Sequence, residues 1–416
     1  YKEGELLGFL LRLSPEQERY GTWGMNGSGP TLLKGGPGTG KSTIALYRVR
    51  SLVQQLRRQG RQDMRILFTT YTNALKRSSE QLLGQLLGDD LRYVDVQTVD
   101  SIAMKLLSHV GIAPRFLDAG EENALLNQAI QPAAFKGDDA QRQAQQQVIG
   151  RLSIDYLHQE INQVIVARQI DTLEAYLAAP RPGRKVRLSD MQRRAVWSVY
   201  TVFQRLLRER GKWTWQQARS YAEQLVAEGV SGMAYDAIVI DEAQDLDPSA
   251  LRLLLRFCKD THRIFLTADA NQSIYGSGFN WSDVHQRLKF QGRTSVLRVN
   301  YRSTREIGEA AQSYLAAGAL DGEQVERDYV HAGPLPAVRV VRSAGDEAQL
   351  LARFLPAAAR ESRLGTAACA VLCPTAKAGK SLAAELTRLD LAATFMSGQE
   401  LNLSQPGVKV LTLKSA

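Results

Sequence analysis

The sequence predicts an α/β fold in which a parallel sheet, with helices on both sides, carries a phosphate-binding loop. Three observations lead to this prediction. Short apolar segments alternate with helical ones, residues 35–43 fit the pattern G-x-x-x-x-G-K-[ST], and one apolar segment ends directly on Asp241 and Glu242. Because open parallel sheets bind ligands at the carboxyl ends of their strands, all three point to one nucleotide site at that edge.

The loop supplies the first candidate residues. Its glycines let the backbone curl so that successive N–H groups face one concavity, which suits phosphate oxygens. Lys41 is predicted to reach the β- and γ-phosphates, and Ser42 to help hold Mg²⁺. A strand at 31–33 and a helix over 43–59 are expected around the loop, with the helix N-terminus facing the anion. The nucleotide-binding loop residues are Gly35, Gly36, Pro37, Gly38, Thr39, Gly40, Lys41, Ser42 and Thr43.

Length and composition set the broad class. At 416 residues the chain is long enough for two or three domains, and no apolar run approaches the roughly 20 residues that span a membrane. Three cysteines and the absence of a signal peptide favour a reducing cytoplasm. A net charge of +9 and a pI near 9.4 indicate a polyanionic partner such as nucleic acid. The chain begins at Tyr1, and we expect it to be a portion of a longer protein.

The first helix begins at Ser14-Pro15-Glu16-Gln17, before the loop. Ser14 and Gln17 fit a capping box, and Gln17 equally fits an amide that reads adenine. After the loop, strands are predicted over 65–70 and 93–97. Thr72, Thr98 and Ser101 follow these strands, where they can cap helices or contact phosphates.

Residues 111–225 lack strand signals and predict a helical insertion. Within it, the basic stretch 180–187 fits either a solvated linker or a contact with a phosphate backbone. The sheet resumes over 235–240 and ends on Asp241 and Glu242. Buried carboxylates are costly unless they are paired or bind a metal, so we expect Asp241 to hold Mg²⁺ and Glu242 to act as a general base.

A strand over 263–267 then leads to Asp269 and Gln272. The aromatic residues that follow are suited either to stacking on bases or to core packing; they are Tyr275, Phe279 and Trp281. A second α/β unit begins near Leu297. Its expected strands cover 338–342, 370–372 and 408–413, with helices near 346–360 and 381–389.

These blocks, in this order, resemble the motif series of the UvrD/Rep/PcrA-type superfamily 1 DNA helicases. The similarity spans nearly the whole chain, and seven ordered blocks make it specific. The matching segments are Ser14–Gln17, residues 35–43, Thr70–Asn73, Thr98–Ser101, Asp241–Asp245, Asp269–Tyr275 and Asn300–Thr304, and Val408–Ala416 resembles the start of the next block.

The resemblance implies a P-loop NTPase with two RecA-like parallel-sheet lobes, ATP between them, and 3′→5′ movement along single-stranded DNA up to a duplex junction. It divides the chain into lobe 1 (1–110 and 226–290), a helical insertion (111–225) and an incomplete lobe 2 (291–416). The implied function is an ATP-dependent DNA helicase or translocase in DNA repair or replication maintenance. The alternatives are an ATP-driven remodeller that displaces a protein such as RNA polymerase from nucleic acid, and a regulatory nucleotide-binding module without motor activity.

The resemblance also assigns roles. Gln17 reads adenine and Tyr301 stacks on it, Gln272 senses the γ-phosphate, and Arg302 is the arginine finger, alongside Lys41, Asp241 and Glu242 in catalysis. The implied DNA contacts are Tyr71, Thr72, Asn73, Thr98, Tyr275 and one of Phe279 or Trp281.

Three departures from the family pattern stand out. Asp100 occupies the place of a usual histidine and puts an anion beside the expected DNA phosphates. The segment 276–281 is longer than is common. About a hundred residues separate Arg302 from Val408, too few for the large second accessory domain of UvrD and Rep.

Overall fold

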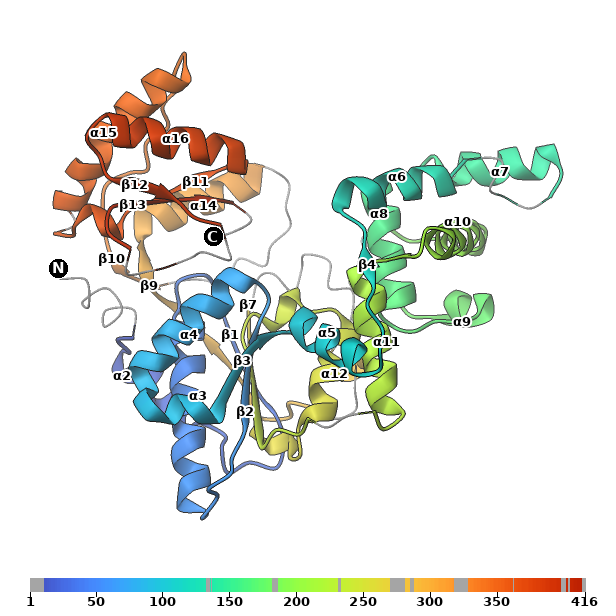
Figure 1. The fold of residues 1–416 in the computed structure, drawn as a ribbon, viewed down its shortest axis with the longest axis horizontal. Helices are drawn as coiled ribbons and strands as arrows, with labels where there is room; N and C mark the ends of the chain where they lie inside the picture. The colour runs from blue at the N-terminus through green and yellow to red at the C-terminus, as the bar shows by residue number, and fades with distance from the viewer. Residues whose placement is uncertain are drawn as a thin grey trace.

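The structure is a computed structural model that describes residues 11–131, 135, 137–181, 186–230, 233–269, 281–284, 288–317, 328–361, 363–397, 402 and 405–413. Figure 1 shows three parts, which we call lobe 1, the insertion and lobe 2. Lobe 1 lies at the bottom, the insertion extends to the upper right, and lobe 2 lies at the upper left.

Lobe 1 is built on a six-stranded parallel sheet in the order β3-β2-β6-β7-β1-β8. Its strands are β1 (Thr31–Gly35), β2 (Ile66–Thr70), β3 (Val94–Thr98), β6 (Ala237–Ile240), β7 (Ile264–Asp269) and β8 (Thr294–Leu297). The central strands are continuous apolar runs because both faces of a parallel sheet are buried.

Helices cover both faces of this sheet. The helices are α2 (Pro15–Glu18), α3 (Lys41–Arg58), α4 (Asn73–Leu87), α5 (Val99–His109), α11 (Trp215–Ala227), α12 (Pro248–Phe257) and α13 (Trp281–Val284). Ile238 and Ile240 of β6 pack with α5, α11 and α12, whereas Ala237 and Val239 pack with α3 and α4. This alternation follows the two-residue period of a strand and makes lobe 1 a three-layer α/β/α unit.

The insertion is helical, as predicted, and has its own core. Its elements are β4 (Arg115–Phe116), α6 (Ala119–Ala129), α7 (Asp139–Ile149), α8 (Ile154–Gln159), the π-helix η4 (Glu160–Val166), α9 (Leu173–Ala178), α10 (Asp190–Glu209) and β5 (Lys212–Trp213). Its core runs from Leu117 to Leu207. The parallel β4–β5 pair joins the insertion to lobe 1. Helix α11 falls within the predicted insertion, yet Ala218 and Ala222 pack in clusters with α5, so it belongs to lobe 1.

Lobe 2 begins after the last strand of lobe 1. Its elements are β9 (Val299–Thr304), α14 (Arg305–Ala317), β10 (Asp328–His331), α15 (Ala344–Glu361), β11 (Ala370–Cys373), α16 (Ala376–Arg388), β12 (Ala393–Phe395) and β13 (Val408–Thr412). The strands form a parallel β10–β9 pair and a sheet in the order β11-β13-β12. Because β8 pairs with β1, lobe 1 extends to Leu297, past the predicted boundary at residue 290.

The strand predicted at 338–342 is wrong: these residues have no strand partner among the described residues. Val338 and Val340 are 86% and 96% exposed. The alternating valines therefore reflect strand propensity, but no neighbouring strand pairs with them in the described part of the chain.

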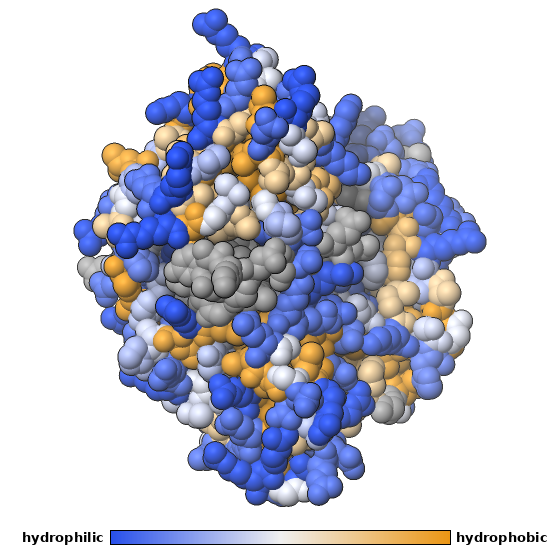
Figure 2. All heavy atoms as spheres, turned by 60° about the vertical axis from the view of Figure 1, so that its left-hand side comes forward, coloured by the Kyte–Doolittle hydropathy of each residue, from blue (hydrophilic) through white to orange (hydrophobic). Residues whose placement is uncertain are grey.

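Figure 2, in which the side that carries lobe 2 is turned forward, shows apolar residues in separate patches among hydrophilic ones. In the described part of the chain, no helix combines the length and apolar character needed to cross a membrane.

Candidate ATP and nucleic-acid site

The loop between β1 and α3 has the curled backbone that its glycines predict. Gly38 and Gly40 adopt φ of +79° and +85°, a region that disfavours other residues. A Cβ on Gly35 would lie 2.5 Å from Thr39 Oγ1, and one on Gly40 would lie 2.2 Å from Gln17 Nε2. The loop therefore needs glycine at these places both for its conformation and for the close approach of its neighbours.

Two side chains line this cradle. Lys41 is 6% exposed, and its ammonium donates to the carbonyl oxygens of Gly35 (2.9 Å) and Gly36 (3.2 Å), so it lies over the loop. Gln17 confirms the capping alternative and also contacts the loop. It completes the capping box with Ser14, and its Nε2 donates to Thr39 O across 2.8 Å, placing an amide at the loop.

Asp241 directly follows β6, lies beside the start of α3 and is only 3% exposed. The hydroxyls of Thr267 and Ser42 donate to its carboxylate, the former across 2.5 Å. Burial and the neighbouring Glu242 raise the pKa of Asp241 to about 6, against the opposing effects of Thr267, Ser42 and Lys41. Paired with a hydroxyl in this way, the carboxylate offers the hard oxygen ligands that Mg²⁺ prefers.

Glu242 follows in a left-handed conformation, with φ +53°. Such a backbone is uncommon for a residue other than glycine and is found most often at functional sites. The backbone N–H of Glu242 donates to Thr267 Oγ1 (3.3 Å), and its carboxylate accepts from Gln244 Nε2 (2.7 Å). Gln244 Oε1 in turn accepts from the backbone N–H of Asp269 (3.0 Å). The predicted base is thus held by a network between the ends of β6 and β7.

Lobe 2 reaches the same loop through β9. The backbone N–H of Tyr301 donates to Gly38 O (2.9 Å), and its hydroxyl donates to Glu16 Oε2 (3.4 Å). Tyr301 therefore lies beside the segment that holds Gln17. Arg302 is exposed, and within the described residues its guanidinium has no hydrogen bond or ion pair, which leaves it available to a ligand.

The predicted nucleic-acid residues of lobe 1 lie at the carboxyl ends of β2 and β3. Thr72 caps α4 and Thr98 caps α5, each accepting from the backbone N–H three residues on, which confirms the capping alternative for both. Tyr71 is 48% exposed, and Asn73 is also exposed. Burial of part of its surface, with Asp245, Asp100 and Asp247 nearby, raises the pKa of Tyr71, against the opposing effect of Arg219.

The remaining predicted residues divide between the described and undescribed parts of the chain. Gln272, Tyr275 and Phe279 lie outside the described residues. Trp281 begins α13, packs against the lobe 1 core and meets Phe290 edge-on, with ring centroids 6.0 Å apart. This position favours a packing role for Trp281.

A cavity of about 350 Å³ lies between lobe 1 and the insertion. Tyr71, Trp215 and Arg219 line it, together with residues 244–248 that follow Glu242. Trp215 is 40% exposed and stacks on Phe116 with ring centroids 3.8 Å apart. This pair was not predicted from the sequence. The signal that could have found it is the aromatic cluster Trp213-Thr214-Trp215.

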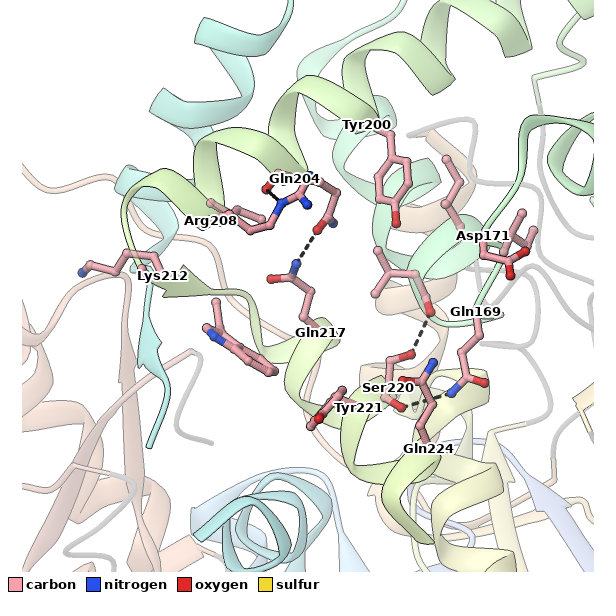
Figure 3. A pocket seen from close by; sticks show the side chains of 16 residues that line it. Gln169, Asp171, Tyr200, Gln204, Arg208, Lys212, Gln217, Ser220, Tyr221 and Gln224 are labelled. Carbon is pink, nitrogen blue, oxygen red and sulfur yellow. Dashed lines mark hydrogen bonds between the residues drawn. The ribbon is translucent and has the colours of Figure 1, made fainter. Parts of the chain in front are cut away.

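A second cavity, of about 510 Å³, lies elsewhere, between η4, α10 and α11 (Figure 3). Gln217 and Gln204 face one another across it and are joined by a 2.7 Å hydrogen bond. Tyr221 of α11 also lines this cavity. Because Trp215 and Arg219 line the smaller cavity, α11 presents different faces to the two.

The family model described as the UvrD/REP helicase N-terminal domain matches residues 14–295. The ATP-dependent DNA helicase PcrA of Leuconostoc citreum is 25% identical over 303 residues, which cover 69% of this chain and 37% of the relative. The ATP-dependent DNA helicase UvrD1 of Mycobacterium tuberculosis is 26% identical over 394 residues, covering 89% and 48% respectively. PcrA of Staphylococcus aureus is 22% identical over 303 residues, covering 69% and 38%. The chain thus spans less than half the length of these relatives.

Proposed function

The chain belongs to the UvrD/REP helicase family, and from this premise we propose that it is the motor part of an ATP-dependent DNA helicase. ATP hydrolysis between the lobes would drive movement along single-stranded DNA in the 3′→5′ direction and open duplex at a junction. We place this activity in the cytoplasm, in DNA repair or replication maintenance. Single-stranded DNA is the proposed partner, and a protein partner is compatible with it.

The observation that carries the proposal is the convergence of both lobes on one loop. Lys41 and Asp241 come from lobe 1, while Tyr301 reaches the loop from lobe 2 and Arg302 follows it. A nucleotide in such a place would contact both lobes. An arginine that meets the γ-phosphate only when the lobes close makes hydrolysis depend on lobe geometry, and that dependence is what a motor requires.

The residues present fit ATP with Mg²⁺. The loop is a cradle that a Cβ at Gly35 or Gly40 would fill, and Ser42 and Asp241 offer oxygen ligands side by side. Bound Mg²⁺ would neutralise developing charge on the phosphates. Around it, Lys41 would hold phosphate oxygens, Glu242 would take the proton of the attacking water, and Gln17 with Tyr301 would hold the base. Gln272 would sense the γ-phosphate.

Tyr71 and Trp215 support nucleic-acid binding. Both are exposed aromatic rings on the walls of one cavity, and stacking on such rings binds single strands with little dependence on sequence. Asn73, which is exposed two positions after Tyr71, would contact the DNA backbone, whereas Thr72 and Thr98 are engaged in capping α4 and α5. The net charge of +9 favours a polyanion in the same way.

A second candidate is an ATP-driven remodeller that displaces a bound protein from nucleic acid. The spacing between Arg302 and Val408 favours it, because this interval lacks room for a large accessory domain. Strand displacement by the full-length protein separates the two functions. We expect release of the annealed strand from a naked duplex with a 3′ tail and none from one with a 5′ tail. Displacement of a protein roadblock without release of the annealed strand would favour the remodeller.

A further inference from the structure

Arg219 on α11 lies between two carboxylates from different parts of lobe 1. Its Nη1 donates to Asp247 Oδ2 across 2.8 Å, and its Nε lies 3.2 Å from Asp100 Oδ1. The Nε–H is directed to Trp215 O (3.4 Å), so the contact with Asp100 is ionic and lacks hydrogen-bond geometry. The Arg219 side chain is only 14% exposed. A buried arginine between two anions holds whatever carries those anions in place.

The first anion, Asp100, lies near the carboxyl ends of β2 and β3, where DNA is predicted to bind. We call this part of lobe 1 the DNA edge. Asp100 is in the first turn of α5, two positions after the cap Thr98, and its side chain is 40% exposed. Burial raises the pKa of Asp100, and Arg219 only partly offsets this. Asp100 is therefore the weakly held and accessible member of the group. A phosphate approaching this edge would repel the carboxylate, and Arg219 is the cation toward which it can move.

The second anion, Asp247, lies at the end of the loop that carries Glu242. Asp247 caps α12, five positions after Glu242, and accepts from Ser249 Oγ (2.5 Å) and from the backbone N–H of Ala250 (3.0 Å). Burial opposes its charge, yet Arg219 and these donors outweigh burial and hold the pKa of Asp247 below its ordinary value. The loop from Glu242 to Asp247 is thus fixed at one end by Thr267 and at the other by Arg219.

We propose that Arg219 is a positioning residue that connects the DNA edge to the loop carrying the catalytic base, so that DNA bound near Asp100 sets the placement of Glu242. The inference rests on the proposed function and assigns a route for DNA stimulation of ATP hydrolysis. The route is short: Asp100, Arg219, Asp247, and then the loop that returns to Glu242. Displacing a catalytic group by about 1 Å can cost a hundredfold in rate, so a small shift of this loop is sufficient.

The test measures ATP hydrolysis by the full-length protein against the concentration of an oligothymidylate. We expect Arg219→Gln to lower the ratio of DNA-stimulated to DNA-free kcat about tenfold to a hundredfold, with ATP affinity unchanged. Arg219→Lys, which keeps the charge, should recover part of the stimulation. Asp100→Asn should also lower stimulation, and the double variant should be no worse than Arg219→Gln alone, because contacting residues do not act additively.

Arg256→Gln is the matched control. Arg256 also joins α12 to α11, through Glu223 at 2.7 Å, and Glu223 keeps Arg252 as a second partner. This variant should keep full stimulation. Stimulation that survives in Arg219→Gln, or that is lost equally in Arg256→Gln, overturns the inference alone. A wild-type protein without any stimulation overturns the proposed function and the inference together.

Discussion

The side-chain amide of Asn300 donates a hydrogen bond to the carbonyl oxygen of Pro37 across 3.1 Å, so the first strand of lobe 2 is fastened to the phosphate-binding loop of lobe 1. The same side chain accepts from the backbone N–H groups of Arg302 and Ser303, each at 2.9 Å. Asn300 thereby sets the start of the segment that carries Arg302 and ties its position to the shape of the loop.

Gly38→Ala tests this connection. Gly38 has φ +79°, and a Cβ there would lie 2.4 Å from Asn300 Oδ1. The left-handed backbone alone costs about 1–2 kcal/mol for other residues, and the contact with Asn300 adds to it. We expect ATP affinity, measured by calorimetry, to fall at least about tenfold. Gly60→Ala is the control, since its φ is +76° and nothing lies within 4 Å. Normal affinity in Gly38→Ala would show that Asn300 does not constrain the loop.

Tyr71→Ala should weaken binding of single-stranded DNA. Stacking on one ring contributes about 1–3 kcal/mol per base, so the affinity measured by fluorescence anisotropy should fall by roughly that free energy. Tyr71→Phe keeps the ring and should bind normally. If both variants bind as the wild type does, the cavity between lobe 1 and the insertion is not on the DNA path.

The His158–Glu122 pair predicts a pH-dependent stability of the insertion. His158 Nε2 lies 2.9 Å from Glu122 Oε1. The hydrogen bond to Glu122 raises the pKa of His158. Burial acts to raise the pKa of Glu122, but the hydrogen bond and charge of His158, together with a hydrogen bond from Asn162, outweigh burial and lower it. The histidine's contribution is complete below its unfolded pKa of 6.5 and is lost as pH rises through its folded pKa. The glutamate's contribution is present above 4.5 and is lost as pH falls through its folded pKa.

The pair therefore stabilises the insertion most between about pH 4.5 and 6.5. The His158 side chain is 38% exposed, which limits the gain to roughly 0.2–1 kcal/mol. Thermal unfolding of the wild type and Glu122→Gln, followed from about pH 5 to about pH 9, should show a difference that shrinks as pH rises. A difference that stays constant over this range would mean that ionisation of His158 does not contribute.

Much of lobe 1 could be predicted because its signals are local. Glycine spacing determines the loop before α3, and continuous apolar runs ending on polar residues mark β2, β6 and β7. The capping role of Gln17 also followed from its position, since it depends on residues near in sequence, whereas its hydrogen bond to Thr39 O was not predicted. Its reading of adenine stays a prediction.

The rest depends on contacts between distant segments. The apolar face of α11 predicts a helix but not the core against which the helix packs. Arg219 and Asp100 are more than a hundred positions apart, and they come into contact only because α11 packs on α5. The strand predicted over 338–342 is wrong because local β propensity alone does not make a strand. A strand also needs a partner, and these residues have none in the described part of the chain. The roles of Lys41, Glu242 and Arg302 stay predictions that the geometry favours.

The most direct test of the central claim is ATP hydrolysis by the full-length protein with and without single-stranded DNA, with RNA for comparison. We predict strong stimulation by DNA alone, no hydrolysis in Lys41→Ala, and ATP binding without turnover in Glu242→Gln, whose side chain keeps the shape but cannot accept a proton. Hydrolysis that is indifferent to both nucleic acids, or a wild-type rate in Glu242→Gln, would contradict the assignment of a DNA-driven motor and of its catalytic base.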